Sequence, residues 1–266
     1  MYCYKIVKIM ERLNEYLSTQ EEKPMSKKII LHLCADIGSD SLYFQQDSDY
    51  EVVLIGQKIG VENIKNYGKV HGIIANPVCT DFSTAKGFHK ENDIEKGMFL
   101  VNHCMRIIKE CNPQWWVLEN PYNGRLKEII GEPKAVYQPW QYGSPWTKKT
   151  ALWGNFEMPK PLYSKWEDVP KIKELYQRPG RGKPSLAFLH KSAINNIPEF
   201  EIFKDKIHDD AGFRSLCSQG FAKAFYEANR TIAQTSTRCA SKRDGRQCRL
   251  TATAMCSSGL EKQNLR

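Results

Sequence analysis

Short apolar runs bounded by polar turn residues recur along the first part of the chain. Four of them have the length and composition of buried strands, at residues 29–33, 50–56, 73–75 and 115–118. Before the fourth run, residues 91–111 carry an apolar stripe with helical spacing that stops before Pro113. Strands alternating with helical segments predict an α/β domain with a doubly wound, mostly parallel sheet.

The rest of the pattern completes one large domain, which we place at residues 25–229. We expect a short helix, two strands and a closing helix at residues 123–131, 136–142, 151–153 and 213–229. Residues 155–210 are rich in Pro, Lys and aromatic side chains and show weak periodicity, so we interpret them as a small insertion.

Both ends of the chain differ from this domain. Residues 1–24 have apolar positions at helical spacing, Pro24 ends the pattern, and the sequence that follows, MSKK, has the character of a protein start. We therefore interpret residues 1–24 as a helical extension without an assigned function. Residues 230–266 are polar and basic, which predicts a flexible, disordered tail.

Composition narrows the class of protein. Hydrophobic residues make up 41% and charged residues 26% of the 266, and no apolar stretch approaches the roughly 20 residues of a membrane span. The N-terminal residues lack the apolar core and cleavage site of a signal peptide. The cysteines number nine and are irregularly spaced, which favours a reducing compartment over a disulfide framework. We expect an intracellular protein that is not bound to membranes.

The formal net charge is +9, from 39 Lys and Arg against 30 Asp and Glu. Basic surface gains affinity for polyanions through phosphate contacts and counterion release, which favours a nucleic-acid partner. Many basic enzymes have no such partner, so the charge alone does not decide the question.

Three cysteines, Cys239, Cys248 and Cys256, cluster in the tail. Their spacing resembles small cysteine–histidine knuckles of phage proteins, in which a His follows the last Cys. Ser257 and Ser258 stand at that place here, whereas structural zinc needs four ligands. A zinc site is therefore the weaker interpretation, and a basic tail that binds nucleic acid nonspecifically is favoured.

A cysteine closely follows one predicted strand. The run 73–75 leads through Asn76 and Pro77 to Cys79, and open α/β sheets bind ligands at the carboxyl ends of their strands. A cysteine is more often a buried small hydrophobe. The polar, turn-forming residues on both sides of Cys79 favour an exposed loop and hence a thiol placed for chemistry.

Two more strand ends reach the same edge of the predicted sheet. The run 115–118 delivers Glu119 and Asn120, and the run 29–33 leads into a glycine-containing turn at residues 34–41. A strand, such a turn and a helix start are typical of nucleotide-cofactor folds. An ordinary strand–helix turn fits the same residues, so both interpretations stay open.

Four stretches, in this order, resemble the DNA cytosine-5 methyltransferases, and most closely a compact, divergent group encoded by bacteriophages. They are LHLCADIGSDS, similar to the cofactor loop; NPVCTDFS, similar to the Pro-Cys-Gln-x-Phe-Ser loop; LENP, similar to the Glu-Asn-Val loop; and FRSLCSQGFAKAFYEAN, similar to the terminal motif. The resemblance spans residues 29–229. It implies a class I methyltransferase fold, a DNA substrate and S-adenosylmethionine as methyl donor.

The resemblance also implies roles for the matching residues. Cys79 would be the nucleophile that adds to ring carbon 6 of a flipped cytosine, and Glu119 would hold the ring nitrogen and amine of that base. The residues that would bind the cofactor are Cys34, Asp36, Ile37, Gly38, Glu62, Asn76 and Pro77. Those that would bind the substrate are Ser83, Asn120, Lys148 and Lys149.

The chain departs from the family pattern at several positions. Asp36 stands where the family has Gly, and Val78 and Thr80 replace the Pro and Gln beside the nucleophile. No acid directly follows the strand at 50–56, which leaves Glu62 as the substitute for the ribose-binding acid.

The leading hypothesis is a monomeric DNA cytosine-5 methyltransferase in the cytoplasm of a bacterial host, which protects viral DNA from restriction or competes with host marking. Residues 155–210 would be its reduced target-recognition segment, which predicts loose sequence selectivity. The divergent cofactor loop supports an alternative, a catalytically weakened DNA-binding or decoy protein of the same fold. A third hypothesis is an enzyme that modifies pyrimidines of RNA or nucleotides with the same Cys and Glu chemistry.

Overall fold

The computed structural model describes residues 26–35, 37–65, 67–82, 93–176 and 182–231. The chain divides into two units, Met1–Ala233 and Gln234–Arg266, and every described residue belongs to the first. The predicted N-terminal helix, Asp36, Ser83 and the three tail cysteines lie outside the described residues. Within the described ranges, no helix is both long and apolar enough to cross a membrane.

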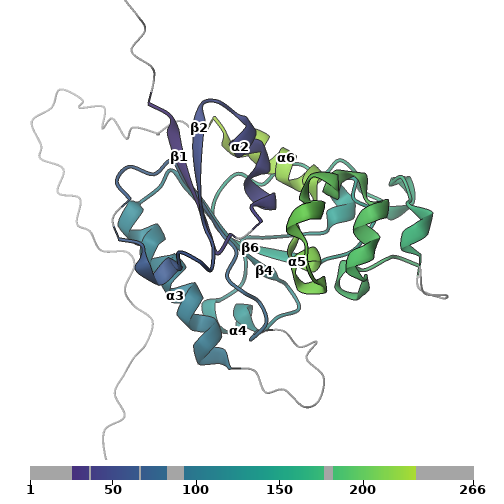
Figure 1. Ribbon diagram of the computed structural model, residues 1–266, viewed down its shortest axis with the longest axis horizontal. Helices are drawn as coiled ribbons and strands as arrows, with labels where there is room; N and C mark the ends of the chain where they lie inside the picture. Colours follow the sequence, from purple (N-terminus) through teal and green to yellow (C-terminus); the bar gives the residue numbers. More distant parts are fainter. Residues whose placement is uncertain (1–25, 36, 66, 83–92, 177–181, 232–266) are drawn as a thin grey trace, which may run out of the picture. The chain divides into compact units, whose positions relative to one another are not determined.

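A six-stranded sheet organises the described part of the chain (Figure 1). Its order is β2-β1-β3-β4-β6-β5, with β1 parallel to β2 and β3, β3 parallel to β4, and β6 antiparallel to both of its neighbours. The strands are β1 (Lys28–Leu33), β2 (Tyr50–Ile55), β3 (Gly72–Ala75), β4 (Trp115–Pro121), β5 (Ala135–Tyr137) and β6 (Thr150–Asn155). The predicted mixed α/β fold with a mostly parallel sheet is confirmed.

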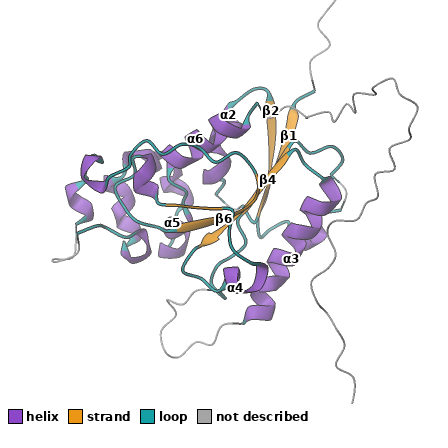
Figure 2. Ribbon diagram, turned by 180° about the vertical axis from the view of Figure 1, so that it is seen from behind, coloured by secondary structure: helices purple, strands orange, loops and turns teal. Residues whose placement is uncertain are grey.

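Helices cover both faces of this sheet. The helix α3 lies on one face, whereas α2 and α6 pack against each other on the opposite face (Figures 1 and 2). The α-helices are α2 (Leu42–Gln46), α3 (Ile94–Cys111), α4 (Leu126–Ile130), α5 (Asp210–Ser215) and α6 (Gln219–Asn229). This two-sided cover is the doubly wound arrangement that the alternating pattern predicts.

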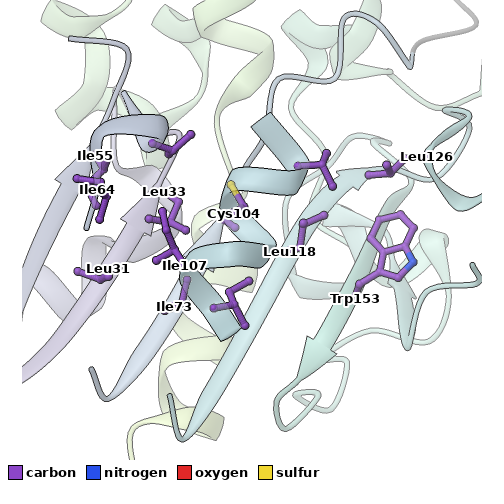
Figure 3. Close-up of a cluster of buried hydrophobic side chains, with 14 of the residues drawn as sticks. Leu31, Leu33, Ile55, Ile64, Ile73, Cys104, Ile107, Leu118, Leu126 and Trp153 are labelled. Carbon is purple, nitrogen blue, oxygen red and sulfur yellow. The ribbon is translucent and has the colours of Figure 1, made fainter. Parts of the chain in front are cut away.

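The core divides according to the alternation of side chains along the strands. On the α3 face, strand residues such as Leu31, Ile73 and Leu118 pack against α3 residues such as Cys104 (Figure 3). On the α6 face, the core consists of Ile30, Ile74, Val117 and Leu152 with the aromatic side chains Phe44, Phe221 and Phe225. Successive strand residues point to opposite faces. The same alternation therefore decides which polar side chains at the strand ends can meet.

The insertion folds around a core cluster of its own. Short 3-10 helices supply most of it, at η5 (Lys173–Leu175), η6 (Leu186–Phe188), η7 (Lys191–Asn196) and η8 (Pro198–Lys206). A further 3-10 helix, η4 (Trp166–Asp168), lies outside this cluster. The cluster includes Trp146, Phe200, Phe203 and Phe213, all buried. A 3-10 turn has three residues and seldom continues, which explains why the sequence shows weak periodicity here.

Three predicted elements differ from the structure. Strand β4 extends to Pro121, so Glu119 and Asn120 lie within the strand and not in a loop after it. The strand expected at 136–142 ends at Tyr137, because Pro139, which has no backbone N–H, begins the 3-10 helix η3 (Pro139–Tyr142).

The closing helix is the third difference. It is two helices, α5 and α6, because Ser218 starts a new one with its side chain, which accepts a hydrogen bond from the N–H of Phe221.

We predict that Gly220→Ala destabilises the fold. An added Cβ at Gly220, in the first turn of α6, would lie 1.9 Å from the carbonyl oxygen of Tyr142. Relieving that contact requires a backbone shift, so we expect a loss of about 1–3 kcal/mol, measured by urea denaturation. Gly182→Ala is the control, since no heavy atom lies within 4 Å of its added Cβ. Equal midpoints for the two variants would contradict the packing of α6 on η3.

Candidate active site

Two candidate loops meet at the carboxyl edge of the sheet. The connection after β1 runs to β2 on one side, and the connection after β3 runs to β4 on the other. Open α/β sheets bind ligands at such a switch point. The turn at residues 34–41 and the loop that carries Cys79 both leave the sheet there, as the sequence predicts.

The Cys79 loop is anchored on both sides. The N–H of Asn76 donates to the carbonyl of Leu33 at 3.0 Å, and the N–H of Phe82 donates to the carbonyl of Cys79 at 3.0 Å. The Phe82 side chain is fully buried, Cys79 is half-buried and Val78 is 54% exposed. The thiol therefore lies in a fixed turn near the surface and is not enclosed in the core.

Glu119 reaches this edge from β4. It pairs with Leu152 of β6, is half-buried, and accepts a 3.4 Å hydrogen bond at Oε2 from Asn76 Nδ2. Burial raises the pKa of its carboxyl. The Lys148 ammonium opposes this shift, and the negative charge of Asp40 adds to it.

Lys148 arrives from the turn before β6. Its Nζ lies 3.5 Å from the carbonyl oxygens of both Ser215 and Leu216. Burial disfavours the ammonium, but the negative charges of Glu119 and Asp40 outweigh this effect and raise the pKa of Lys148. A lasting positive charge is therefore held beside the carboxyl groups.

The thiol responds to these charges. Burial raises the pKa of Cys79, the negative charge of Glu119 raises it further, and the Lys148 ammonium lowers it. The Asn76 amide bonds Glu119 and the Asn120 amide bonds the carbonyl of Pro77, so the Cys79 loop is held against β4. Lys148 stands just before β6, which pairs with β4, so the three side chains gather at one edge of the sheet although they come from distant parts of the chain. In this state the thiol is held protonated, and neutralising Glu119 favours the thiolate.

Two residues predicted to bind substrate lie apart from this group. Lys149 places its Nζ 3.8 Å from the centre of the Tyr122 ring, because neighbouring residues at a strand point to opposite faces. Asn120 is buried and donates from Nδ2 to the carbonyl of Pro77 at 3.0 Å. Asn120 therefore ties the Cys79 loop to β4, and a direct contact of either residue with substrate stays a prediction.

The residues predicted to bind the cofactor have mixed surroundings. The Cys34 sulfur lies 3.8 Å from Cys104 Sγ on α3, and Ile37 packs against the insertion cluster. Gly38 has a φ of 78°, which a glycine adopts readily. The remaining three, Glu62, Asn76 and Pro77, are respectively exposed, half-buried and buried.

Sequence reasoning missed several residues of the site. Asp40 lies in the 3-10 helix η1 (Ser39–Ser41) and accepts from Asn76 Nδ2 at 3.2 Å. Cys217 is buried, and its N–H donates to Ser39 Oγ at 3.0 Å, which joins the start of α6 to this turn. The signal for Asp40 was present, since it is an acid in the first loop at the ligand-binding edge.

A small cavity of about 20 Å³ lies between the sheet and α6. Its lining includes Asp40, Glu119 and Cys217 together with apolar side chains such as Phe221. This volume has room for about one water molecule, and its surface is almost entirely apolar. It is too small for a pyrimidine, so a base would have to approach Glu119 from the open edge of the sheet.

The chain is similar to a viral protein. No protein-family model matches it. Over 132 residues it is 34% identical to a protein of Frog virus 3 (isolate Goorha) described as "Probable DNA (cytosine-5)-methyltransferase". The match covers 42% of this chain and 59% of the relative, so it spans about three-fifths of that protein's length. The family resemblance of the sequence motifs is confirmed, whereas a bacteriophage source and a bacterial host stay predictions.

One solved structure shows a more distant likeness. It is a crystal structure, from E. coli, of a "putative DNA modification methyltransferase encoded within prophage", with 16% sequence identity and a TM-score of 0.36. The alignment covers 63% of this chain and 54% of that one.

We predict opposite effects of two substitutions on the alkylation of Cys79. Glu119→Gln removes the negative charge that raises the pKa of the thiol, so iodoacetamide at pH 8 should react faster. Lys148→Met removes the positive charge that lowers this pKa, so the reaction should slow. Peptide mass spectrometry assigns the modification to Cys79.

The control for this prediction is Lys149→Met, which removes an equal charge from the neighbouring residue on Tyr122. It should leave the alkylation rate of Cys79 unchanged. If Lys148→Met and Lys149→Met behave alike, Lys148 is not the cation beside the thiol.

Proposed function

We propose that the chain methylates ring carbon 5 of cytosine in DNA, with S-adenosylmethionine as methyl donor. The observation that supports this most strongly is the convergence of the Cys79 thiol, the Glu119 carboxyl and the Lys148 ammonium at the carboxyl edge of the sheet. The similarity to the viral protein suggests the substrate.

Cys79 is the nucleophile in this proposal. Ring carbon 5 of cytosine is a poor nucleophile, and a thiolate that adds to ring carbon 6 turns the ring into an enamine with electron density on carbon 5. The thiolate is the reactive form of cysteine. Burial is the larger effect that raises the pKa of Cys79 and the charge of Glu119 adds to it, so neutralising Glu119 eases loss of the thiol proton to solvent.

Glu119 supplies the proton that this addition requires. Electron density moves onto the ring as sulfur adds, and a carboxylic acid at the ring nitrogen donates a proton there. The raised pKa of Glu119 favours the protonated form of the side chain. Lys148 holds a positive charge beside the base while negative charge develops on it.

The remaining steps return the base to an aromatic form. Carbon 5 bonds to the methyl group as the bond between that group and the sulfur of the donor breaks, and the ring nitrogen returns its proton to Glu119. Carbon 5 then loses its own proton to solvent, and the electrons of that C–H bond form the double bond between carbons 5 and 6. The sulfur of Cys79 leaves with the electrons of its bond to carbon 6. The enzyme is thereby regenerated, and the product carries one added methyl group.

Two features, the turn after β1 and the acid after β2, support the methyl donor. The turn after β1 has two residues with positive φ, Cys34 at 57° and Gly38 at 78°, which brings backbone close to the sheet edge. Glu62 follows β2 and lies over Gly60, where a Cβ would come within 2.3 Å of Glu62 Oε1. In this proposal the Glu62 carboxylate bonds the ribose of the donor. When bound, S-adenosylmethionine supplies an electrophilic methyl group.

DNA has to present its cytosine outside the helix for this reaction. Carbon 6 is inaccessible to a protein nucleophile in a stacked duplex, so the base must be flipped out. A net charge of +9 favours the phosphate contacts that accompany flipping.

Trapping of a covalent adduct tests the proposal. DNA with 5-fluorocytosine has fluorine in place of the proton that leaves carbon 5, so the final elimination fails and the adduct persists. We expect wild type with S-adenosylmethionine to form an adduct that survives denaturation, and Cys79→Ser to form none.

Glu119→Gln provides the second variant. Its DNA binding should survive, while turnover on ordinary cytosine falls about 10²- to 10⁴-fold because a positioned acid is lost. Equal turnover of wild type and Glu119→Gln would remove Glu119 from the mechanism. DNA binding by wild type without any adduct on DNA or RNA would favour the decoy alternative.

A further inference from the structure

A chain of hydrogen bonds runs from the turn after β1 to Glu119. His32 is buried, with its Nδ1 2.8 Å from Ser41 Oγ and its Nε2 2.8 Å from Asn76 Oδ1. Asn76 Nδ2 then lies 3.2 Å from Asp40 Oδ1 and 3.4 Å from Glu119 Oε2. Five side chains from β1, its turn, the Cys79 loop and β4 are thus connected.

The chemistry of these groups fixes the direction of each bond. Both carboxylates can accept from the Asn76 amide nitrogen, which has two N–H groups, one for each. The amide oxygen of Asn76 therefore faces His32, so His32 must carry its proton on Nε2 and accept from Ser41 at Nδ1. Burial lowers the pKa of His32, in accord with a neutral ring.

A reversed Asn76 amide would be costly. Its oxygen would then face the two carboxyl groups in place of the N–H groups that they accept from. Asp40 and Glu119 thus hold the Asn76 amide in one orientation, and the His32 ring takes the tautomer that matches it. The amide in turn occupies Glu119 Oε2 as a donor, which leaves Oε1 as the oxygen that can carry a proton.

We propose that Asp40 is a positioning residue that pairs with Glu119 across the Asn76 amide and favours protonation of the Glu119 carboxyl for the methylation reaction. This rests on the proposed function. The negative charge of Asp40, which bonds the same amide nitrogen, opposes ionisation of Glu119 in a half-buried site. Asp40 thereby favours the protonated form of Glu119, which donates to the base. The Asn76 amide occupies Oε2, so Oε1 is the oxygen that donates.

Other ionisable groups also face Glu119, and their effects are separable. Lys148 lies before β6 and lowers the pKa of Glu119, whereas Asp40 raises it. Cys79, Cys217 and Tyr137 are neutral in this state, because burial raises the pKa of each. Asp40 is the negatively charged neighbour that a single conservative substitution can neutralise.

The test measures the ionisation of Glu119 directly. The protein is labelled with ¹³C at glutamate side-chain carboxyls and titrated by NMR, and the Glu119 signal is assigned by its loss in Glu119→Gln. We expect Asp40→Asn to shift the Glu119 titration to lower pH. Asp205→Asn, which removes the same charge from an exposed position in η8, should cause no shift.

Asn76→Ala is a second variant with the opposite expected sign. Loss of its hydrogen bond to Glu119 removes a contact that favours the ionised form, so the Glu119 titration should move to higher pH. In the methylation assay, the limb of the pH–rate profile that depends on Glu119 should move to lower pH in Asp40→Asn, in parallel with the NMR titration.

The outcomes separate this inference from the proposed function. An unchanged Glu119 titration in Asp40→Asn, with wild type active, overturns the role of Asp40 alone. If Asp40→Asn does not fold, an unchanged titration in Asn76→Ala overturns the bridge. A wild-type protein that forms no adduct refutes the proposed reaction. It then also refutes the role of the Asp40–Glu119 pair in that reaction, whatever the titrations show.

Discussion

Alternation of side chains along the parallel strands is the constraint on which the site depends. The pairing of β1, β3 and β4 sets His32, Ile74 and Val117 side by side. Residues two positions later on β3 and β4 share their face, so Asn76 and Glu119 both point toward α6. A shift of one residue in either pairing would turn one of them to the α3 face. The register of the sheet therefore decides whether the hydrogen-bonded carboxyl pair can exist.

The antiparallel strand β6 brings the positive charge of Lys148 to the site. Because it runs back beside β4, the residues just before it reach the carboxyl edge, and Lys148 arrives beside Glu119. The result is a half-buried group of two carboxyls, an amide and an ammonium next to a thiol. In such a site each ionisation depends on the others, so the reactivity of Cys79 is coupled to the protonation of Glu119.

The sequence predicted the sheet, the long helix and the edge that carries Cys79 and Glu119, since these depend on strong apolar periodicity. It did not separate Lys148 from Lys149, because both precede β6 and their directions depend on contacts with Ser215, Leu216 and Tyr122 that the sequence does not reveal. Asp40 stands in the first loop at that edge, but its pairing with Glu119 depends on a hydrogen bond to Asn76 that the sequence does not reveal either. The 3-10 helices of the insertion leave no periodic signal, so that core was not predicted.

A crystal structure of the protein bound covalently to DNA with 5-fluorocytosine tests the central claim most directly. The account predicts a bond between Cys79 Sγ and ring carbon 6, with Glu119 within hydrogen-bond distance of the ring nitrogen on the same extruded base. A base bound at this edge with Cys79 turned away from it, or with Glu119 out of reach, would contradict the account.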